Sequence, residues 1–333
     1  GNSSPSTPYT ANKAGKGPAW DNSLFEDNAE HGLGMQIGQE VLRDQAIASA
    51  EKCASSDKAS AELKDAFAKF METKQDTKAN TPATEALVAE LEKAAAAGCP
   101  DAKAALEKKD YLAKKSVWIF GGDGWAYDIG FGGLDHVLAS GHNVNVMVFD
   151  TEMYSNTGGQ SSKSTPTGAI AQFAAGGKET KKKDLAGIAM SYGYVYVAHI
   201  SMGADMNQCV KALAEAEAYP GPSLIIAYAP CINHGIKKGM SKAQTEEKLA
   251  VESGYWFNFR YNPTLAAEGK DAFSLDSKEP TGDYQAFLKG ENRYASLAKF
   301  NPERAAELFA KAEKNSKDEY DHLKKLVTLY AGK

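Results

Sequence analysis

The chain has 333 residues, enough for one large domain or two of ordinary size, and hydrophobic residues make up 43% of it, which suffices for a buried core. Its formal net charge of −5 argues against nucleic acid as a partner. The sequence contains no apolar run long enough to span a bilayer and no signal-peptide pattern at its start. Its 4 cysteines are scattered, which suits a reducing compartment better than a disulfide framework. These features agree with a cytoplasmic, soluble enzyme, and we expect no membrane partner.

The first 115 residues divide into two stretches of different composition. Residues 1–35 are rich in Gly, Pro, Ser and Asn, which predicts an extended, irregular segment. Residues 36–115 are dominated by Ala, Lys and Glu, and their apolar residues recur at helical spacing, so we expect an inserted arm of three or four helices. Thr81 followed by Pro82 is typical of a helix start, because proline is tolerated in the first turn. We expect the arm to pack on a neighbouring domain or subunit rather than to act in catalysis.

Residues 116–263 alternate between continuous apolar runs and segments with helical periodicity. The apolar runs predict strands at 116–120, 143–150, 194–201 and 223–229. The periodic segments predict helices at 125–140, 166–175, 183–192, 204–218 and 241–253. This alternation predicts a doubly wound α/β fold with a mainly parallel sheet, whose ligands bind at the carboxyl ends of the strands. For residues 264–333 we expect an irregular stretch and then a C-terminal helix from about residue 302.

A short motif, Gly121-Gly122-Asp123-Gly124, follows the first predicted strand, and Thr151 follows the second. Mg²⁺ prefers oxygen ligands and usually binds one or two protein groups together with phosphates. The Asp123 carboxylate, the Thr151 hydroxyl and the Met153 carbonyl could supply such ligands. Gly122 and Gly124 would let the backbone approach a diphosphate at the start of the next helix. The spacing therefore points to thiamine diphosphate with Mg²⁺, although a lone Gly-Asp-Gly would more simply predict a tight turn without a ligand.

Three longer stretches carry a more specific pattern: 17–30, 121–135 with its continuation 150–160, and 228–235. They closely resemble the thiamine diphosphate domain of pyruvate:ferredoxin (flavodoxin) oxidoreductase, and the resemblance extends from about residue 1 to residue 263. The run Asp150-Thr-Glu-Met-Tyr-Ser-Asn-Thr-Gly-Gly-Gln160 is far more specific than Gly-Asp-Gly alone. Thr151, at a position where many thiamine enzymes have Asn, is typical of this family.

The resemblance implies a function for the whole enzyme and a place for this chain within it. The family oxidises and decarboxylates pyruvate with coenzyme A to acetyl-CoA and CO₂, and it passes electrons through iron–sulfur clusters to ferredoxin or flavodoxin. The chain would be the C-terminal portion of such an enzyme, completed by the remaining domains, and we expect a homodimer. A location in an organelle resembling the hydrogenosome is expected if the source is an anaerobic eukaryote.

The resemblance also assigns roles to individual residues. The loop at 152–165 would wrap the cofactor, with Ser155, Asn156 and Thr157 in contact with it and Trp125 at the diphosphate end. Asn156 would lie close to the substrate and take part in catalysis. Without the resemblance, Asn156 would be interpreted as a residue that stabilises a turn through its own backbone.

The resemblance also assigns a role to one of the cysteines. In the family, the cysteine of the Tyr228–Asn233 pattern is the fourth ligand of a [4Fe–4S] cluster, so Cys231 would be a cluster ligand whose three partners precede residue 1. By its residue type alone, Cys231 would be interpreted as a small buried hydrophobic side chain. The remaining cysteines, Cys53, Cys99 and Cys209, are predicted to be structural.

Two other functions remain open at this stage. One is an oxidoreductase for another 2-oxo acid, or a non-oxidative decarboxylase, built on the same fold. The other is a non-catalytic domain that retains the fold without the cofactor, against which the pair of Asp123 and Thr151 argues.

Overall fold

The computed structural model describes residues 17–19, 21–23 and 26–332. The chain forms two compact units, one made of Gly32–Val117 and the other of the residues up to His31 together with Trp118–Lys333. Most of the segment 1–35 that was expected to be extended lies outside the described residues, as do Trp20, Leu24 and Phe25. Helix α1 (Asn28–Ala54) begins earlier than the sequence predicts, so the expectation of extended chain is wrong for residues 28–35.

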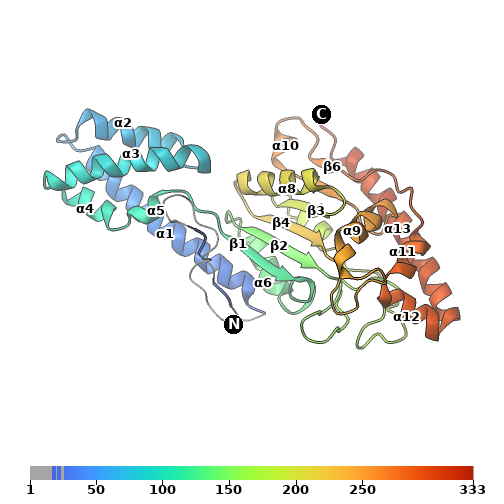
Figure 1. Ribbon diagram of the computed structural model, residues 1–333. Coiled ribbons are helices and arrows are strands. Elements are labelled where there is room, and N and C mark those ends of the chain that lie inside the picture. The colour runs from blue at the N-terminus through green and yellow to red at the C-terminus, as the bar shows by residue number, and fades with distance from the viewer. Residues whose placement is uncertain (1–16, 20, 24–25, 333) are drawn as a thin grey trace. The chain divides into compact units, whose positions relative to one another are not determined.

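A six-stranded sheet of order β1-β2-β4-β3-β5-β6 forms the centre of the larger unit (Figure 1). The first four strands of this order pair in parallel: β1 (Trp118–Gly122), β2 (Asn145–Asp150), β4 (Ser223–Tyr228) and β3 (Tyr196–Ile200). The short strands β5 (Phe259–Tyr261) and β6 (Phe273–Leu275) add an antiparallel edge. The predicted doubly wound, mainly parallel α/β fold is confirmed, and the four expected strands lie within two residues of their predicted limits at each end.

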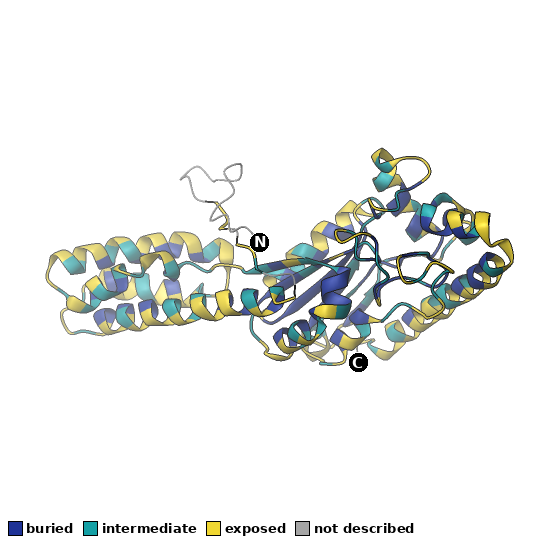
Figure 2. Cartoon of the chain, turned by 90° about the horizontal axis from the view of Figure 1, so that it is seen from below, coloured by how far each residue is buried: buried dark blue, intermediate teal, exposed yellow. Residues whose placement is uncertain are grey.

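Helices cover the sheet and follow its strands along the chain. They are a π-helical turn (Gly124–Ile129), α6 (Phe131–Ala139), α7 (Leu185–Met190), α8 (Met206–Ala218), a 3₁₀ turn (Met240–Lys242), α9 (Ala243–Glu252), α10 (Thr264–Ala267), α11 (Tyr284–Gly290), α12 (Asn292–Phe300) and α13 (Pro302–Leu329). Aspartates cap several of them: Asp205 accepts from the Gln208 N–H at the start of α8. In Figure 2 the central strands β3 and β4 are mostly buried, whereas the surrounding helices turn exposed faces outward.

One face of the sheet is covered by α8. Cys209, Ala212 and Ala216 of this helix pack against strand residues of β3 and β4, among them Ile200 and Ile225. All six residues of β4 are buried, as expected for a central strand of a parallel sheet. Cys209 is therefore a buried packing residue, in agreement with the sequence.

Two helical predictions for the larger unit need correction. Residues 166–175 form turns and isolated bridges instead of a helix, and Gly168 with φ +86° and Phe173 with φ +66° take conformations that no α-helix contains. The predicted helix 125–140 opens with the π-helical turn, which changes the angle between successive side chains. For this reason Ile129, expected on the buried stripe with Trp125, is 53% exposed.

The smaller unit consists of helices alone: most of α1, then α2 (Ala61–Glu72), α3 (Thr77–Ala96), α4 (Pro100–Leu106) and α5 (Lys109–Leu112). Leu63, Phe70, Leu87 and Leu91 lie in its core, as their helical spacing predicts. Helix α3 starts at Thr77, where Asp76 caps the N–H groups of Lys78 and Ala79. The predicted start at Thr81–Pro82 is wrong, because the Asp76 cap begins the helix earlier and leaves Pro82 inside it.

After residue 263 the chain is more regular than predicted. The expected helix from residue 302 is present as α13, with Asn301 accepting from the Arg304 N–H and Pro302 as its first residue. The stretch before it contains β6, α10, α11 and α12, which are too short for their periodicity to stand out in the sequence. In the described part of the chain, no helix is both long enough and apolar enough to cross a membrane.

Candidate functional site

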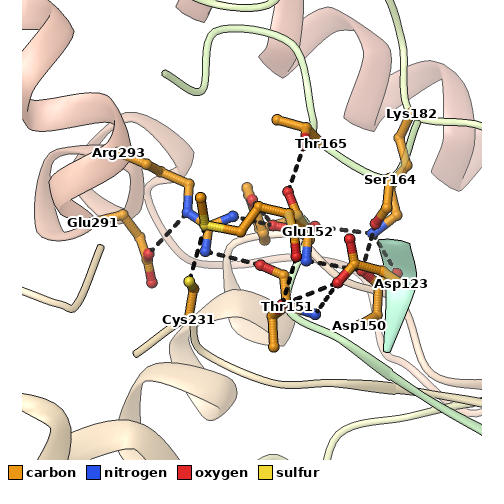
Figure 3. A network of polar contacts seen from close by, with 12 residues as sticks. Asp123, Asp150, Thr151, Glu152, Ser164, Thr165, Lys182, Cys231, Glu291 and Arg293 are labelled. Atoms are coloured by element: carbon orange, nitrogen blue, oxygen red, sulfur yellow. Dashed lines mark hydrogen bonds and ion pairs between the residues drawn. The ribbon is translucent and has the colours of Figure 1, made fainter. Parts of the chain in front are cut away.

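The carboxyl ends of β1 and β2 bring Asp123 and Thr151 into contact. The two strands run in parallel with Gly122 opposite Phe149, so the residues that follow them lie at the same edge of the sheet. Thr151 donates its backbone N–H and its hydroxyl to Asp123 Oδ1, at 3.2 and 3.0 Å (Figure 3). The Ser162 hydroxyl donates to the other oxygen, Oδ2, at 2.8 Å. The side chains that the sequence singled out are thus joined directly.

The Thr151 hydroxyl also reaches the carbonyl of Met153. Its Oγ1 lies 3.1 Å from this carbonyl oxygen and 3.0 Å from Asp123 Oδ1. A hydroxyl has one proton to donate, so it can satisfy only one of these two acceptors fully. Three oxygen atoms of different residues therefore converge, and Asp123 Oδ1 also accepts from the Thr151 backbone N–H. Such a set of oxygen atoms could bind a cation.

The buried position of Asp123 changes its titration. Burial raises the pKa of this carboxyl to about 7, the negative charge of Asp150 adds to the effect, and the hydrogen bonds from Ser162 and Thr151 oppose it. Perturbed carboxylates of this kind cluster at functional sites, although structural ion pairs produce them too. A positive ion beside Asp123 would bring the pKa down again, since it favours the charged form.

A second layer of charged groups holds the end of β2 in place. The Lys182 ammonium lies 2.7 Å from Asp150 Oδ2 and 3.0 Å from Glu152 Oε1. The Tyr127 hydroxyl donates to Asp150 at 2.8 Å, and the Ser164 hydroxyl donates to its other oxygen. Both carboxylates are almost completely buried, so the lysine compensates two negative charges that water cannot reach.

Glu152 turns the backbone after the end of β2. Its backbone has φ +65°, a left-handed conformation that residues other than glycine rarely adopt. The residue is only 2% exposed. Arg293 donates to the Glu152 carboxylate at 3.3 Å and to the Thr151 carbonyl at 3.1 Å. The Tyr255 hydroxyl donates to the same carboxylate, and the Thr165 hydroxyl donates to the Glu152 carbonyl at 2.6 Å. These bonds overdetermine the strained residue and fix the backbone between Thr151 and Met153.

The glycines of the motif have different surroundings. A Cβ atom placed on Gly122 would have no atom within 4 Å, so this position opens onto free space beside Asp123. A Cβ atom on Gly124 would lie 2.5 Å from the ring of Tyr154. Gly124 is thus required by protein packing, whereas packing sets no such requirement at Gly122.

Trp125 and the loop residues are placed in three different ways. Trp125 is fully buried, and a Cβ on Gly121 or on Gly130 would overlap its ring, so its side chain is packed inside the protein. Ser155 lies next to Cys231, with 3.7 Å between Oγ and Sγ. Asn156 and Thr157 occupy the exposed part of the loop, and the Thr157 hydroxyl donates to the Gln160 side chain.

Cys231 is buried against the same loop. Its Sγ lies 3.0 Å from the sulfur of Met153, and the two residues form a small apolar cluster with Ala171. The residue thus stands beside the Asp123–Thr151–Met153 group. Among the residues that the structure describes, no group of three or more His, Cys, Asp or Glu side chains is arranged to hold a metal. Any cluster bound to Cys231 would therefore need ligands from outside the described residues.

Sequence reasoning missed the residues that support the site. Ser162 and Ser164 lie in the loop that the sequence marked as functional, but nothing in their spacing showed which carboxylate each would bind. Lys182 belongs to the run Lys181-Lys182-Lys183, which is typical of a solvated surface. Arg293 lies 142 positions beyond Thr151, and only the folded chain brings the two together.

Comparison with known proteins agrees with this arrangement. Residues 91–227 match the family model "Thiamine pyrophosphate enzyme, C-terminal TPP binding domain". Over 98% of its own length, the chain is 55% identical to a pyruvate-flavodoxin oxidoreductase from Klebsiella pneumoniae, and the matched segment is 28% of that protein. It is 56% identical over 98% of its length to 28% of a pyruvate:ferredoxin oxidoreductase from Moorella thermoacetica. It is also 49% identical over 90% of its length to 16% of the mitochondrial pyruvate dehydrogenase [NADP(+)] of Euglena gracilis.

The mainly parallel α/β fold and the family model together assign the chain a thiamine pyrophosphate-binding domain. The resemblance found in the sequence is confirmed: the chain is a homologue of one portion of the pyruvate:ferredoxin (flavodoxin) oxidoreductases. It spans about 28% of the length of the two bacterial relatives.

The charge balance around Lys182 leads to a first prediction. Lys182→Met should lower the free energy of unfolding by about 3 kcal/mol, because it leaves the buried Asp150 carboxylate without its ion pair and leaves Glu152 with Arg293 alone. Urea denaturation followed by circular dichroism measures the change. Lys181→Met, at the exposed neighbouring position, is the matched control and should change stability little. Equal losses in the two variants would contradict the role of Lys182.

A second prediction concerns the pH dependence of stability without a bound cation. Because the pKa of Asp123 is raised to about 7 in the folded chain, the folded state holds a proton that the unfolded state has already released between about pH 4 and pH 7. This group therefore lowers stability as the pH rises through that window, by up to about 1.4 kcal/mol per pH unit. Asp123→Asn should become progressively more stable than the unaltered chain from pH 5 to pH 7. A stability difference independent of pH, measured by urea denaturation, would contradict the raised pKa.

Proposed function

We propose that this chain forms the Mg²⁺ and diphosphate half of the active site of a thiamine diphosphate-dependent pyruvate oxidoreductase, and that Cys231 supplies one thiolate to its iron–sulfur cluster. The names of the relatives support pyruvate over other 2-oxo acids as the substrate. Coenzyme A is the acyl acceptor in this proposal, and ferredoxin or flavodoxin takes up the electrons. The rest of the enzyme lies outside the chain, and the protein works as a dimer in the cytoplasm.

The convergence of three oxygen atoms from different residues carries the proposal. The Asp123 carboxylate, the Thr151 hydroxyl and the Met153 carbonyl form a chain of contacts of 3.0 and 3.1 Å. This set contains one formal negative charge, which suits Mg²⁺, because that ion usually retains waters and takes phosphate oxygens as further ligands. The carboxylate would bind in its charged form, with Thr151 and Ser162 fixing its orientation.

The space beside this group suits a diphosphate. Gly122 has no neighbour where a side chain would project, so a phosphate can approach the backbone closely there. Ser155, Asn156 and Thr157 belong to the polar loop that follows Met153, and we assign them to contacts with the cofactor, as we do Trp125. Asn156, exposed in this loop, is assigned to hydrogen bonding with the substrate. The bound cofactor supplies an electron sink for decarboxylation of the 2-oxo acid.

The position of Cys231 supports its assignment as a cluster ligand. Its sulfur lies against Met153, whose carbonyl is one of the three converging oxygen atoms. A cluster held there would stand close to the cofactor, which favours electron transfer. Four thiolates hold such a cluster, and three of them would come from outside the described residues.

A third prediction tests the cofactor site by calorimetric titration of the chain with thiamine diphosphate and Mg²⁺. Asp123→Ala should abolish Mg²⁺-dependent binding, because it removes the only charged ligand. Gly122→Ala should leave the fold intact and lower the affinity, since its methyl group would occupy space that is free in the protein alone. Gly132→Ala is the matched control, at another glycine without neighbours. The proposal fails if the unaltered chain shows no saturable binding, or if Asp123→Ala binds equally well.

A fourth prediction tests Cys231 in the complete enzyme. Cys231→Ala should lower the content of iron and acid-labile sulfide and slow the reduction of the electron carrier, because a four-thiolate cluster loses one ligand. Cys209→Ala, which removes a buried thiol of α8 that packs against the sheet, is the control and should retain both. If Cys231 only packs against Met153, its loss should lower stability by about 1 kcal/mol and leave the iron content unchanged. Full iron content with normal reduction of the carrier would refute the assignment.

A further inference from the structure

Two cysteines face each other in the helical unit. Cys53 stands near the end of α1, and Cys99 directly precedes α4. Their sulfur atoms are 3.0 Å apart. A disulfide bond is about 2.05 Å long, so a movement of about 1 Å would bring the two atoms to bonding distance.

The backbone holds Cys99 in this position. Gly98 has φ +94°, which turns the chain sharply at the end of α3. The Cys99 N–H donates to the Ala94 carbonyl at 3.0 Å, and Pro100 fixes the first residue of α4. Cys53 is held from the other side, because it belongs to the packed core of the helical unit. The short distance between the sulfurs is therefore set by two constrained segments.

The two thiols are not equivalent. Cys53 is 3% exposed, and its burial raises the pKa of its thiol to about 12. Cys99 is partly exposed, and the hydrogen bond from Cys53 lowers the pKa of its thiol. The proton thus stays on Cys53, and Cys99 gains thiolate character. Since the thiolate is the reactive form, Cys99 is the sulfur suited to attack an external reagent.

We propose that Cys53 and Cys99 form a reversible disulfide by exchange with low-molecular-weight disulfides. The Cys99 thiolate attacks one sulfur of the external disulfide, breaks its S–S bond and releases one thiolate. Cys53 then loses its proton to water and attacks the Cys99 sulfur of the mixed disulfide, which releases the second thiolate. The cysteine pair gives up two electrons, and the external disulfide is reduced to two thiols.

The bond would tie α1 to the start of α4. It would join residues 46 positions apart, and α2 and α3 lie between them in the chain. A cross-link of this kind stabilises mainly by restricting the unfolded chain. The helical unit would then respond to the thiol–disulfide balance around it, independently of the cofactor site, whose residues all belong to the other unit.

The fifth prediction is tested on the 333-residue chain with glutathione disulfide as the oxidant. After incubation, free thiols are alkylated in denaturant, and intact mass and peptide mapping locate the bonds. The unaltered chain should lose two of its 4 thiols and yield one peptide pair joined through Cys53 and Cys99. Dithiothreitol should restore all of them. Unfolding of the helical unit, followed by circular dichroism, should shift upward on the order of 10 °C on oxidation.

Three variants separate the two thiols. Cys53→Ser should stop at a glutathione adduct on Cys99, and Cys99→Ser should leave Cys53 unmodified. Cys209→Ser is the control and should form the cross-link as the unaltered chain does. Helical circular dichroism of each reduced variant shows whether it has folded. All thiols remaining free, glutathione adducts on both cysteines of the unaltered chain, or a cross-link in Cys53→Ser would each overturn the proposal.

Discussion

The Lys182 ammonium lies between two buried carboxylates, Asp150 and Glu152, at the end of β2, and the geometry of the site depends on this contact. Without it, the buried Asp150 carboxylate would lose its ion pair while it lies next to the carboxylates of Glu152 and Asp123. With it, the chain can pass through the left-handed conformation of Glu152, which Arg293 and Tyr255 hold from the other side. The Thr151 hydroxyl and the Met153 carbonyl then point to the same place as the Asp123 carboxylate.

The backbone of the site is held rigidly, but the charge of the Asp123 carboxylate is not balanced by an ion pair of its own. Lys182 forms ion pairs with Asp150 and Glu152, whereas Asp123 is held by hydrogen bonds with a weaker attraction from Lys182, and burial keeps its pKa high. Such a residue lowers the stability of the protein when it is ionised and alone. A cation and a diphosphate bound there would reverse this effect, since binding to the folded state alone adds to its stability. The strained backbone of Glu152 lies next to the atoms that would bind the metal, as is common for strained residues at functional sites.

The two units of the chain carry different chemical groups. The α/β unit carries the charged network and the converging oxygens, and its only buried thiol near them is Cys231. The helical unit contains no part of this network, but it brings together Cys53 and Cys99. The sequence predicted that both would be structural. Packing in the core of the unit agrees with that prediction. The contact between their sulfur atoms was not predicted by the spacing of the residues in the sequence.

The sequence by itself determined the fold class, the four parallel strands and the convergence of Asp123 with Thr151. It could do so because continuous apolar runs mark buried parallel strands, and residues that follow such strands meet at one edge of the sheet. It misplaced the helix at 166–175 and missed β5 and β6, because short or glycine-rich segments take their conformation from neighbours rather than from their own periodicity. The partners of the site were decided only by tertiary structure. Lys182 and Arg293 come from distant segments, and whether such a charge is buried beside a carboxylate or left in solvent depends on packing that local sequence does not encode.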